Sequence, residues 1–197
     1  MYKKRIFIFS SNKGKIKEIK KFFPKKNFKF YTTKDFKKFK SPKEDGKSFE
    51  KNAIIKSKFG YNLSKIPCIA DDSGICIDAM SGSPGINSNR FQKQLGGYKK
   101  AIKKIIKTIK KKGEKGATFK TVISFTYKKN KTITFSGIKK GVIVKKPVGK
   151  NGFGYESIFK PNGHLKTYAQ MSKIEKNRIS HRGVAINKLV NFTNKIN

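Results

Sequence analysis

Apolar residues recur along the chain with two spacings, and at the N-terminal end these predict a strand, a helix and a second strand. The run Arg5–Ser11 (RIFIFSS) predicts a buried strand, and the run 27–33 (NFKFYTT) predicts a short one. Between them Ile16 and Ile19 lie on one face of a predicted helix, and Pro24 predicts its end. The N-terminal segment is therefore expected to alternate between strand and helix.

A second helix and two more strands are expected in the middle of the chain. Ser48 can cap a helix that continues to about Leu63, after an exposed loop at 34–47. The run 66–70 (IPCIA) predicts a strand that stops at an acidic pair, and 74–80 (GICIDAM) predicts another strand beyond the pair. The helix residues expected to face inward are Phe49, Ala53, Ile54 and Phe59.

The second half of the chain begins with a strongly amphipathic pattern at 98–112, which predicts a helix. The stretch 117–144 alternates between apolar and polar residues and is rich in β-branched and aromatic side chains, which predicts an antiparallel meander. We expect this meander to be interrupted at 128–131 (KKNK) and at Gly141.

The C-terminal segment combines a glycine-rich loop with helices. Residues 149–159 predict that loop and a short strand after it, and 172–194 predict one or two helices. The capping-box spacing of Ser172 and Glu175 supports the first of these helices. The order of elements predicts an α/β fold with a mixed sheet, and the absence of a linker or repeat predicts a single domain over 1–197.

The charge of the chain is strongly positive, at a formal +38 with 49 Lys and Arg against 11 Asp and Glu. Only four of these basic residues are Arg, although Arg is the side chain preferred for bidentate contacts with phosphates and guanine. The lysines are spread over the whole chain and form no tail or stripe. We therefore interpret the charge as a bias of composition, which would still attract polyphosphate anions, and expect no specific nucleic-acid partner.

The cysteines and the apolar runs indicate the cellular compartment of the protein. Cys68 and Cys76 do not have the spacing of a zinc site and lie in apolar runs, which favours small buried thiols in a reducing cytosol. No apolar stretch is long enough to span a membrane, and the first residues do not read as a signal peptide. A cytoplasmic protein is therefore predicted.

The segment Ser10–Lys15 (SSNKGK) lies where the first strand meets the first helix. A helix N-terminus presents free N–H groups and partial positive charge, and Ser10, Asn12 and Lys15 add further donors. The segment could cradle phosphate, although it is not a Walker A sequence. An ordinary capped turn between a strand and a helix explains it equally well.

Asp71 and Asp72 are adjacent acids in a chain that has few acids. Neighbouring carboxylates repel one another, so a metal ion such as Mg²⁺ or a nearby lysine should compensate them. The alternative is a structural turn in which Asp side chains cap backbone N–H groups. Glu44 and Asp45 form a second pair, for which a solvated turn is the simpler reading, and Lys56 on the following helix could reach a phosphate.

Two further segments carry side chains that could recognise a ligand. Phe153 lies between two glycines, so its ring could be presented for base stacking, and Arg182 beside His181 can donate hydrogen bonds to a carbonyl oxygen. Core packing is an equal alternative for Phe153. Helix capping near Ser180 is an equal alternative for the His181–Arg182 pair.

Together these segments resemble the ITPase/Ham1 family of noncanonical purine nucleoside triphosphate pyrophosphatases, in its bacterial form. The resemblance covers nearly the whole chain, and its motifs are SSNKGK, SFEKNAIIKSK, IPCIADDSGICIDAMSGSPGINSNRF, GFGYESIF and EKNRISHRG. It implies an elongated mixed sheet flanked by helices, with two lobes and an active-site cleft between them. It also implies a Mg²⁺-dependent homodimeric hydrolase that cleaves ITP, dITP and XTP to the monophosphate and pyrophosphate.

The resemblance also assigns roles to residues. It gives the metal site to Glu44, Asp71 and Asp72, with Asp72 as general base. It gives the phosphate contacts to Ser10, Asn12, Lys15 and Lys56. The residues implied at the base and sugar are Ser73, Phe153, Gly154, Tyr155, Glu156, Lys176, Ser180, His181 and Arg182.

Two positions depart from the family pattern. Lys51 stands where the family usually has an acid before the asparagine of its ENA motif, and Glu156 stands where it has a base-reading Asp. Two alternatives to this function remain: a catalytically inactive basic nucleic-acid-binding protein on the same fold, and a Maf-like nucleotide pyrophosphatase. The intact pair Asp71–Asp72 argues against lost catalysis, and the SHRG segment (180–183) points away from the Maf-like enzyme.

Overall fold

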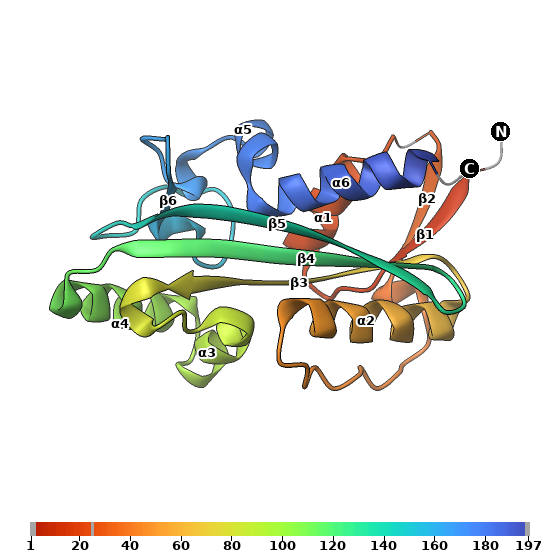
Figure 1. Cartoon of the computed structure of the whole chain (residues 1–197), viewed down its shortest axis with the longest axis horizontal. Coiled ribbons are helices and arrows are strands. Elements are labelled where there is room, and N and C mark those ends of the chain that lie inside the picture. The colour runs from red at the N-terminus through yellow and green to blue at the C-terminus, as the bar shows by residue number, and fades with distance from the viewer. Residues whose placement is uncertain (1–2, 25, 196–197) are drawn as a thin grey trace. The chain divides into compact units, whose positions relative to one another are not determined.

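The computed structural model describes residues 3–24 and 26–195. Figure 1 shows the order of its elements along the chain. The strands are β1 (Lys4–Ile8), β2 (Phe28–Thr32), β3 (Cys68–Ile77), β4 (Gly116–Lys128), β5 (Lys131–Ile143) and β6 (Phe159–Pro161). The helices are α1 (Lys13–Lys21), α2 (Phe49–Ser64), α3 (Ser88–Gln94), α4 (Tyr98–Lys112), α5 (Lys173–Ile179) and α6 (His181–Lys195).

The six strands form one sheet in the order β2-β1-β3-β4-β5-β6. Strand β1 pairs in parallel with β2 and β3, whereas β5 pairs antiparallel with β6. The two-residue turn at Lys129 and Asn130 joins β4 to β5, and Asn130 takes the left-handed conformation that such turns favour. The predicted α/β fold with a mixed sheet flanked by helices is therefore confirmed, as is the predicted break at 128–131.

The chain divides into two compact units, each assembled from several stretches of sequence. Unit 1 comprises the described residues up to Asp72 together with Thr121–Ser136 and Ala185 onward. Unit 2 comprises Ser73–Lys120 and Gly137–Val184. Strands β3, β4 and β5 contribute residues to both units. The expectation of a single domain stays a prediction.

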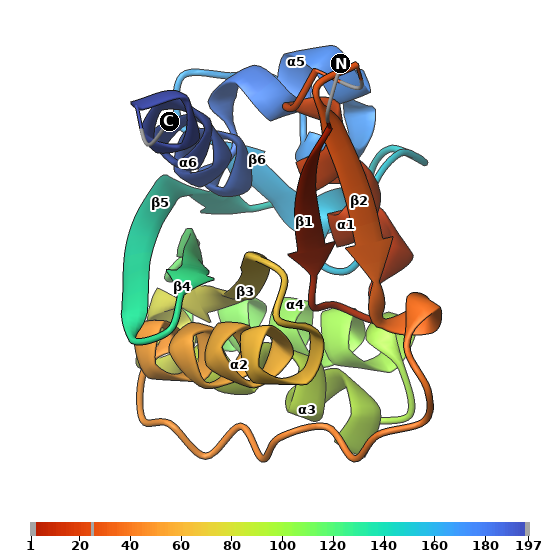
Figure 2. The same ribbon diagram turned by 90° about the vertical axis from the view of Figure 1, so that its right-hand side faces the viewer.

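Unit 1 has an apolar core on each face of its part of the sheet. Successive strand residues point to opposite faces, so Ile8 and Ile69 contribute to one core and Phe7 and Cys68 to the other. Helices α1 and α6 cover the first core, with Ile19 of α1 fully buried in it. Helix α2 lies on the other side of these strands, as Figures 1 and 2 show. The helix and the first strand predicted from the N-terminal pattern thus bury their apolar faces in these cores.

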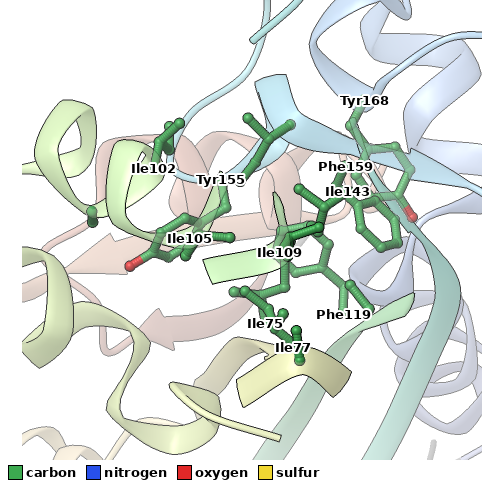
Figure 3. Close-up of a cluster of buried hydrophobic side chains, with 14 of the residues drawn as sticks. Ile75, Ile77, Ile102, Ile105, Ile109, Phe119, Ile143, Tyr155, Phe159 and Tyr168 are labelled. Atoms are coloured by element: carbon green, nitrogen blue, oxygen red, sulfur yellow. The ribbon is translucent and has the colours of Figure 1, made fainter. Parts of the chain in front are cut away.

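The core of unit 2 gathers around helix α4. Ile102, Ile105 and Ile109 lie on the buried side of this helix, and Figure 3 shows them with Ile75 and Ile77 of β3. Aromatic residues complete the core: Phe119, Tyr155, Phe159 and Tyr168. The amphipathic pattern at 98–112 therefore predicted both the helix and its buried face. Among the described residues, no helix combines the length and apolar character needed to cross a membrane.

The prediction that a strand stops at the acidic pair is wrong. Strand β3 runs without a break from Cys68 to Ile77, through both aspartates. No turn is needed because lysine side chains compensate the two carboxylates, as described below. Gly74 allows the segment at Gly85 to pack closely on this strand, since a Cβ there would collide with the carbonyl oxygen of Gly85. The residues beyond the strand, Asp78–Met80, form a 3-10 turn that had been expected to belong to a strand.

The prediction that Gly141 interrupts the meander is also wrong. Strand β5 continues through Gly141 to Ile143, and Gly141 is opposite Pro161 of β6. A Cβ at position 141 would collide with the carbonyl oxygen of Lys160 and with the ring of Phe159. The glycine therefore permits a close strand pairing at a point where the sequence suggested a turn.

Helix α2 differs from its prediction in the side chains that it buries. Ser48 caps it as predicted, its hydroxyl accepting a hydrogen bond from the N–H of Lys51. The buried face, however, is small and polar, because it meets polar side chains as well as apolar ones; its residues are Asn52, Ala53, Ser57 and Gly60. Of the four residues expected to face inward, Ala53 is fully buried and Phe49, Ile54 and Phe59 are half-buried. The two thiols are both free, Cys68 buried and Cys76 half-buried.

Candidate active site

The loop between β1 and α1 is organised by its own polar side chains. The hydroxyl of Ser10 accepts a hydrogen bond from the N–H of Asn12 at 3.2 Å, and Asn12 Oδ1 accepts one from the N–H of Lys15 at 3.1 Å. Asn12 is thereby the N-cap of α1, and the first turn of this helix contains no acidic residue. The free N–H groups and the partial positive charge at this end of the helix are suited to an anion.

Asp71 and Asp72 point to opposite faces of β3, because consecutive strand residues alternate. Asp71 shares a face with Ile69 on the α1 side, where its Oδ2 lies 2.8 Å from Nζ of Lys15. Asp72 shares the other face with Cys68 on the α2 side, where its Oδ1 lies 3.2 Å from Nζ of Lys56. Lysine therefore relieves the repulsion between the carboxylates, as one of the two sequence hypotheses proposed, and the carboxylates are not equivalent.

The aspartates lie where the parallel pairing of β1 and β3 ends. The paired residues are Phe7 with Cys68 and Ile8 with Ile69, and β3 then continues beyond the end of β1. The carboxyl ends of parallel strands are where α/β proteins place ligand sites, because the preceding loops and helix N-termini meet there. The sequence predicted the end of a strand at this point, and the structure has the end of a parallel pairing there instead.

Glu44 is held in this cluster by Lys56. The Lys56 Nζ lies 2.6 Å from Glu44 Oε2, so one ammonium group bridges the carboxylates of Glu44 and Asp72. The simpler interpretation of this segment was a solvated turn, and that interpretation does not account for the ion pair between Glu44 and Lys56. We define the unit 1 cluster as Lys15, Glu44, Lys56, Asp71 and Asp72.

Burial and charge shift two pKa values in the unit 1 cluster. Burial raises the pKa of Asp72 above its ordinary value, although Lys56 and Lys15 act against this rise. Burial alone would lower the pKa of Lys56, but the nearby carboxylates, Asp72 foremost, outweigh it and raise that pKa. Shifted groups that face one another in this way are typical of catalytic sites.

The donor set of the unit 1 cluster can be tested against Mg²⁺. Among the described residues, no three His, Cys, Asp or Glu side chains lie close enough together to hold a metal ion by themselves. Mg²⁺ is usually bound by one or two carboxylates together with water and substrate phosphates. Glu44 and Asp72, joined through Lys56, supply a pair of carboxylates of this kind and so fit a Mg²⁺ ion that arrives with a phosphate ligand. Asp71 points to the opposite face of β3, and its part in a metal site stays a prediction.

In unit 2, a glycine-rich loop presents an aromatic ring between two cations. Gly152 and Gly154 flank Phe153 with φ angles of 83° and 68°, a region that favours glycine. The Nζ of Lys176 lies 5.4 Å from the centroid of the Phe153 ring, and Cζ of Arg182 lies 5.7 Å from it. Cations at these distances interact favourably with the ring, which fixes its place beside them.

Glu156 anchors this loop from within the protein. Both of its carboxylate oxygens lie 3.0 Å from Nζ of Lys176, and its Oε2 accepts a hydrogen bond from the N–H of Phe153 at 3.2 Å. Glu156 and Lys176 are only 4% and 7% exposed, so this is a buried ion pair. The unit 2 cluster is defined as Phe153, Glu156, Lys176, His181 and Arg182.

Arg182 and His181 lie at the start of α6. Arg182 Nη2 donates a hydrogen bond to the hydroxyl of Ser73 at 3.2 Å, and Ser73 directly follows Asp72 in the chain. The His181 ring stacks on Phe119 with a centroid distance of 4.6 Å and an interplanar angle of 12°. Both side chains are buried, so their donors are held in fixed directions.

The remaining residues expected at the base or sugar support the loop and helix. Ser180 lies between α5 and α6, and its hydroxyl accepts a hydrogen bond from the N–H of Gly183 at 3.1 Å. Tyr155 belongs to the unit 2 core, and its hydroxyl donates to the carbonyl oxygen of Ser88 at 2.9 Å. Gly154 lies beside the ring of Tyr98. A role for these residues at a substrate stays a prediction.

Sequence reasoning missed Asn52. Its side chain is 4% exposed and is hydrogen-bonded to both Gly46 and Asp72. Its signals in the sequence were its place in the SFEKNAIIKSK motif and its position one helical turn before Lys56.

Comparisons with known proteins find relatives that match nearly the whole chain. The curated dITP/XTP pyrophosphatase of Christiangramia forsetii is 34% identical over 191 residues, 97% of this chain and 100% of that protein. The dITP/XTP pyrophosphatase of Flavobacterium psychrophilum is 37% identical over 183 residues, 93% of this chain and 95% of that protein.

Solved structures are similar over the same length. A HAM1 protein from Coxiella burnetii has a TM-score of 0.88 and 31% identity, and the match covers 98% of this chain and 99% of that one. The Ham1 protein of Staphylococcus aureus has a TM-score of 0.82 and 36% identity, with 98% of this chain and 100% of that one covered. The model of the Ham1 family matches residues 6–192. The resemblance inferred from the motifs is thus confirmed, and the chain belongs to the Ham1 family.

Proposed function

We propose that the protein is a nucleoside-triphosphate pyrophosphohydrolase that converts ITP, dITP and XTP to the monophosphate and pyrophosphate. The observation that carries this proposal is the match, over nearly the whole chain, to relatives named dITP/XTP pyrophosphatase. The unit 1 cluster supports it, because two lysines and three carboxylates next to a helix N-terminus suit a triphosphate and its cation. Such an enzyme would remove noncanonical purine nucleotides from the nucleotide pool.

The phosphates would be held by the loop at the start of α1 and by two lysines. Ser10 and Asn12 keep the loop in shape, and the N–H groups at the start of α1 would donate hydrogen bonds to phosphate oxygens. Lys15 and Lys56 now neutralise the cluster's carboxylates, and phosphate oxygens would be alternative partners for both ammonium groups. Glu44 and Asp72 would hold Mg²⁺ from the α2 side, and Asp71 would contribute from the α1 side of β3. When bound, the ion would neutralise charge on the phosphates and on the departing pyrophosphate.

The reaction needs a base beside the α-phosphate, and Asp72 suits this role. Its pKa is raised by burial, which makes its carboxylate a better proton acceptor, and Lys56 keeps it oriented. Asp72 would take one proton from water while the water oxygen attacks the α-phosphorus. The bond from that phosphorus to the oxygen bridging to the β-phosphate breaks, and its electron pair leaves with pyrophosphate.

The unit 2 cluster would recognise the base. Phe153 would stack on the purine, and Arg182 and His181 would donate hydrogen bonds to O6 of hypoxanthine or xanthine. Adenine has an amino group at this position, so it would leave the buried donors without acceptors and would bind less well. Glu156 and Lys176 would hold the ring of Phe153 in place, with Ser73, Gly154, Tyr155 and Ser180 around them.

A substrate panel with product identification tests this function. Purified protein with Mg²⁺ should convert ITP, dITP and XTP to the monophosphate and pyrophosphate much faster than ATP or GTP. EDTA should stop the reaction, and added Mg²⁺ should restore it. Release of IDP and inorganic phosphate would contradict the assigned bond cleavage.

The same panel separates the alternatives. Tight, salt-dependent binding of oligonucleotides without hydrolysis of any triphosphate would favour the inactive nucleic-acid-binding protein. Preference for other nucleotides over ITP and XTP would favour the Maf-like enzyme. The match to dITP/XTP pyrophosphatases over nearly the full length favours neither. The homodimer and the cytoplasmic location stay predictions of the resemblance, and light scattering of the purified protein tests the dimer.

A further inference from the structure

Asn52 connects two parts of the unit 1 cluster that are far apart in the sequence. Its Oδ1 accepts a hydrogen bond from the backbone N–H of Gly46 at 2.8 Å, and its Nδ2 lies 3.5 Å from Oδ2 of Asp72. We propose that Asn52 is a positioning residue, which orients the carboxylate of Asp72 and fixes the loop that carries Glu44. This inference rests on the proposed function of Asp72 as the base.

The amide group suits this position because it offers an acceptor and a donor at once. The N–H of Gly46 can only donate, so it fixes which end of the amide carries the oxygen. The NH₂ group must then face Asp72, whose carboxylate can only accept while it is ionised. The orientation of Asn52 is therefore determined by its two partners, and no other standard side chain of the same length offers this pair of groups.

Two residues of α2 hold the two oxygens of Asp72 separately. Lys56 approaches Oδ1 at 3.2 Å and Asn52 approaches Oδ2 at 3.5 Å. These residues are four apart, so they lie one above the other on the same face of the helix. Donors on both oxygens limit rotation of the carboxylate, which sets the direction in which it can accept a proton from water.

The same two residues also secure the loop that leads to α2. Lys56 pairs with Glu44, and Asn52 binds the backbone two residues further on, at Gly46. The loop passes so close to the helix that a Cβ at Gly46 would lie 2.7 Å from Oδ1 of Asn52 and 2.8 Å from Cβ of Lys51. The glycine at position 46 therefore allows the backbone to reach the Asn52 amide.

Burial makes the hydrogen bonds of Asn52 costly to lose. Asn52 is 4% exposed and Asp72 is 8% exposed, so water can replace the amide's hydrogen bonds only poorly. Glu50, the nearest acid to the position where the family's acid is replaced by Lys51, instead accepts a hydrogen bond from Thr134 at 2.7 Å. Of the α2 side chains, Asn52 and Lys56 therefore contact the proposed base, and Glu50 is hydrogen-bonded elsewhere.

Asn52→Asp separates the two contacts. The aspartate keeps an acceptor for the N–H of Gly46, but it replaces the donor toward Asp72 with a second carboxylate. We expect kcat for ITP to fall about 10- to 100-fold with KM changed by less than about threefold, since substrate contacts are left in place. Calorimetric binding of a non-hydrolysable α,β-methylene analogue of ITP should be close to that of the wild type.

Asn52→Ser is the second variant, and Ser57→Ala is the matched control. Serine fits the space but is too short to reach both partners, so it should also lower kcat and it carries the test if the aspartate variant does not fold. Ser57 is buried on the same helix and hydrogen-bonded to Ser124 and Thr126, away from the cluster. Its alanine variant should lose stability in a urea titration while kcat stays within about twofold of the wild type.

A double-mutant cycle distinguishes positioning from a general loss of structure. If Asn52 acts through Asp72, adding Asn52→Asp to Asp72→Asn should lower the residual kcat by less than about twofold. A further tenfold loss in the double variant would contradict the inference, as would single variants of Asn52 that keep the wild-type kcat. Absence of pyrophosphate release from the wild type would instead overturn the proposed function, so the two failures are distinguishable.

Discussion

The unit 1 cluster and the unit 2 cluster stabilise their charged groups in different ways. In unit 1, three carboxylates share two lysines, and one of these lysines bridges two of the acids. In unit 2, one carboxylate is bound by one lysine at two equal distances, and an aromatic ring lies beside two cations. The first arrangement leaves carboxylate charge in excess of ammonium charge, whereas the second is neutral around its ion pair.

The difference indicates what each cluster can accept. When phosphates and a cation bind, the ion pairs of unit 1 can be exchanged. Each lysine can then pair with a phosphate and each carboxylate with the cation, so every group keeps a partner of opposite charge. A buried pair that is already matched has no such freedom and serves to hold the loop of Phe153 rigidly. Chemistry is therefore expected to depend on unit 1, and selectivity and local stability on unit 2.

The largest expected effect comes from removing the proposed base. Asp72→Asn should lower kcat for ITP by about 10²- to 10⁴-fold, because the amide cannot accept the proton from water. Binding of a non-hydrolysable ITP analogue should persist, since the lysines remain. Pyrophosphate release measures kcat, and calorimetry measures binding of the analogue. An active Asp72→Asn enzyme would contradict the assignment of the chemistry to the unit 1 cluster.

A large effect on stability is expected in unit 2. Lys176→Met keeps most of the side-chain volume but leaves the Glu156 carboxylate buried without its ammonium partner, which should lower the free energy of unfolding by about 3–5 kcal/mol. Urea titration followed by circular dichroism measures this loss. The double variant Lys176→Met/Glu156→Gln is the control and should recover part of it. A loss below about 1 kcal/mol would mean that the pair is effectively solvated.

Truncation of the proposed stacking ring should affect binding more than turnover. Phe153→Ala should raise KM for ITP about 10- to 100-fold, since stacking contributes roughly 1–3 kcal/mol per base. The value of kcat should change little because the unit 1 cluster is untouched. Phe153→Tyr, which keeps the ring, is the matched control in the same steady-state assay. A fall in kcat with unchanged KM would place Phe153 with the chemistry.

The smallest expected effect is in the turn after β2. Asp35 accepts hydrogen bonds from the backbone and side chain of Thr32, and these lower its pKa below the ordinary value. A lowered pKa stabilises the fold above the ordinary pKa of about 4 and loses this contribution as the pH falls. Asp35→Asn should therefore lower the melting temperature by about 2 °C at pH 7, since the site is exposed.

The pH series provides the check on that last prediction. The difference in melting temperature between wild type and Asp35→Asn should shrink as the pH is lowered below about 4. Thr33, next in this turn, donates a hydrogen bond to the carbonyl oxygen of Ser10 in the proposed phosphate loop. Kinetic constants for ITP that change in the Asp35→Asn variant would show that the turn also supports the unit 1 cluster.

Much of the fold could be predicted because local patterns and packing agree. Helix α4 has its apolar residues on one face, and α5 begins at the Ser172–Glu175 capping box, so both were found from spacing alone. Two of the failures occurred at Asp71–Asp72 and at Gly141, where residues typical of turns lie inside strands. Lysines from two helices stabilise the aspartates within β3, and the close pairing of β5 with β6 requires the glycine at position 141. Both causes involve residues that are distant in the sequence.

The sequence by itself determined the residue types of the proposed site and the family to which they belong. The motifs around Ser10, Asp71, Phe153 and His181 are short, ordered and specific, and the chemistry of carboxylates and donors follows from their identity. Only the tertiary structure decided how these groups are paired. Alternation along β3 sends Asp71 to Lys15 and Asp72 to α2, and burial converts these contacts into fixed orientations. Pairing depends on distance in space, and that distance is set by the packing of helices on the sheet.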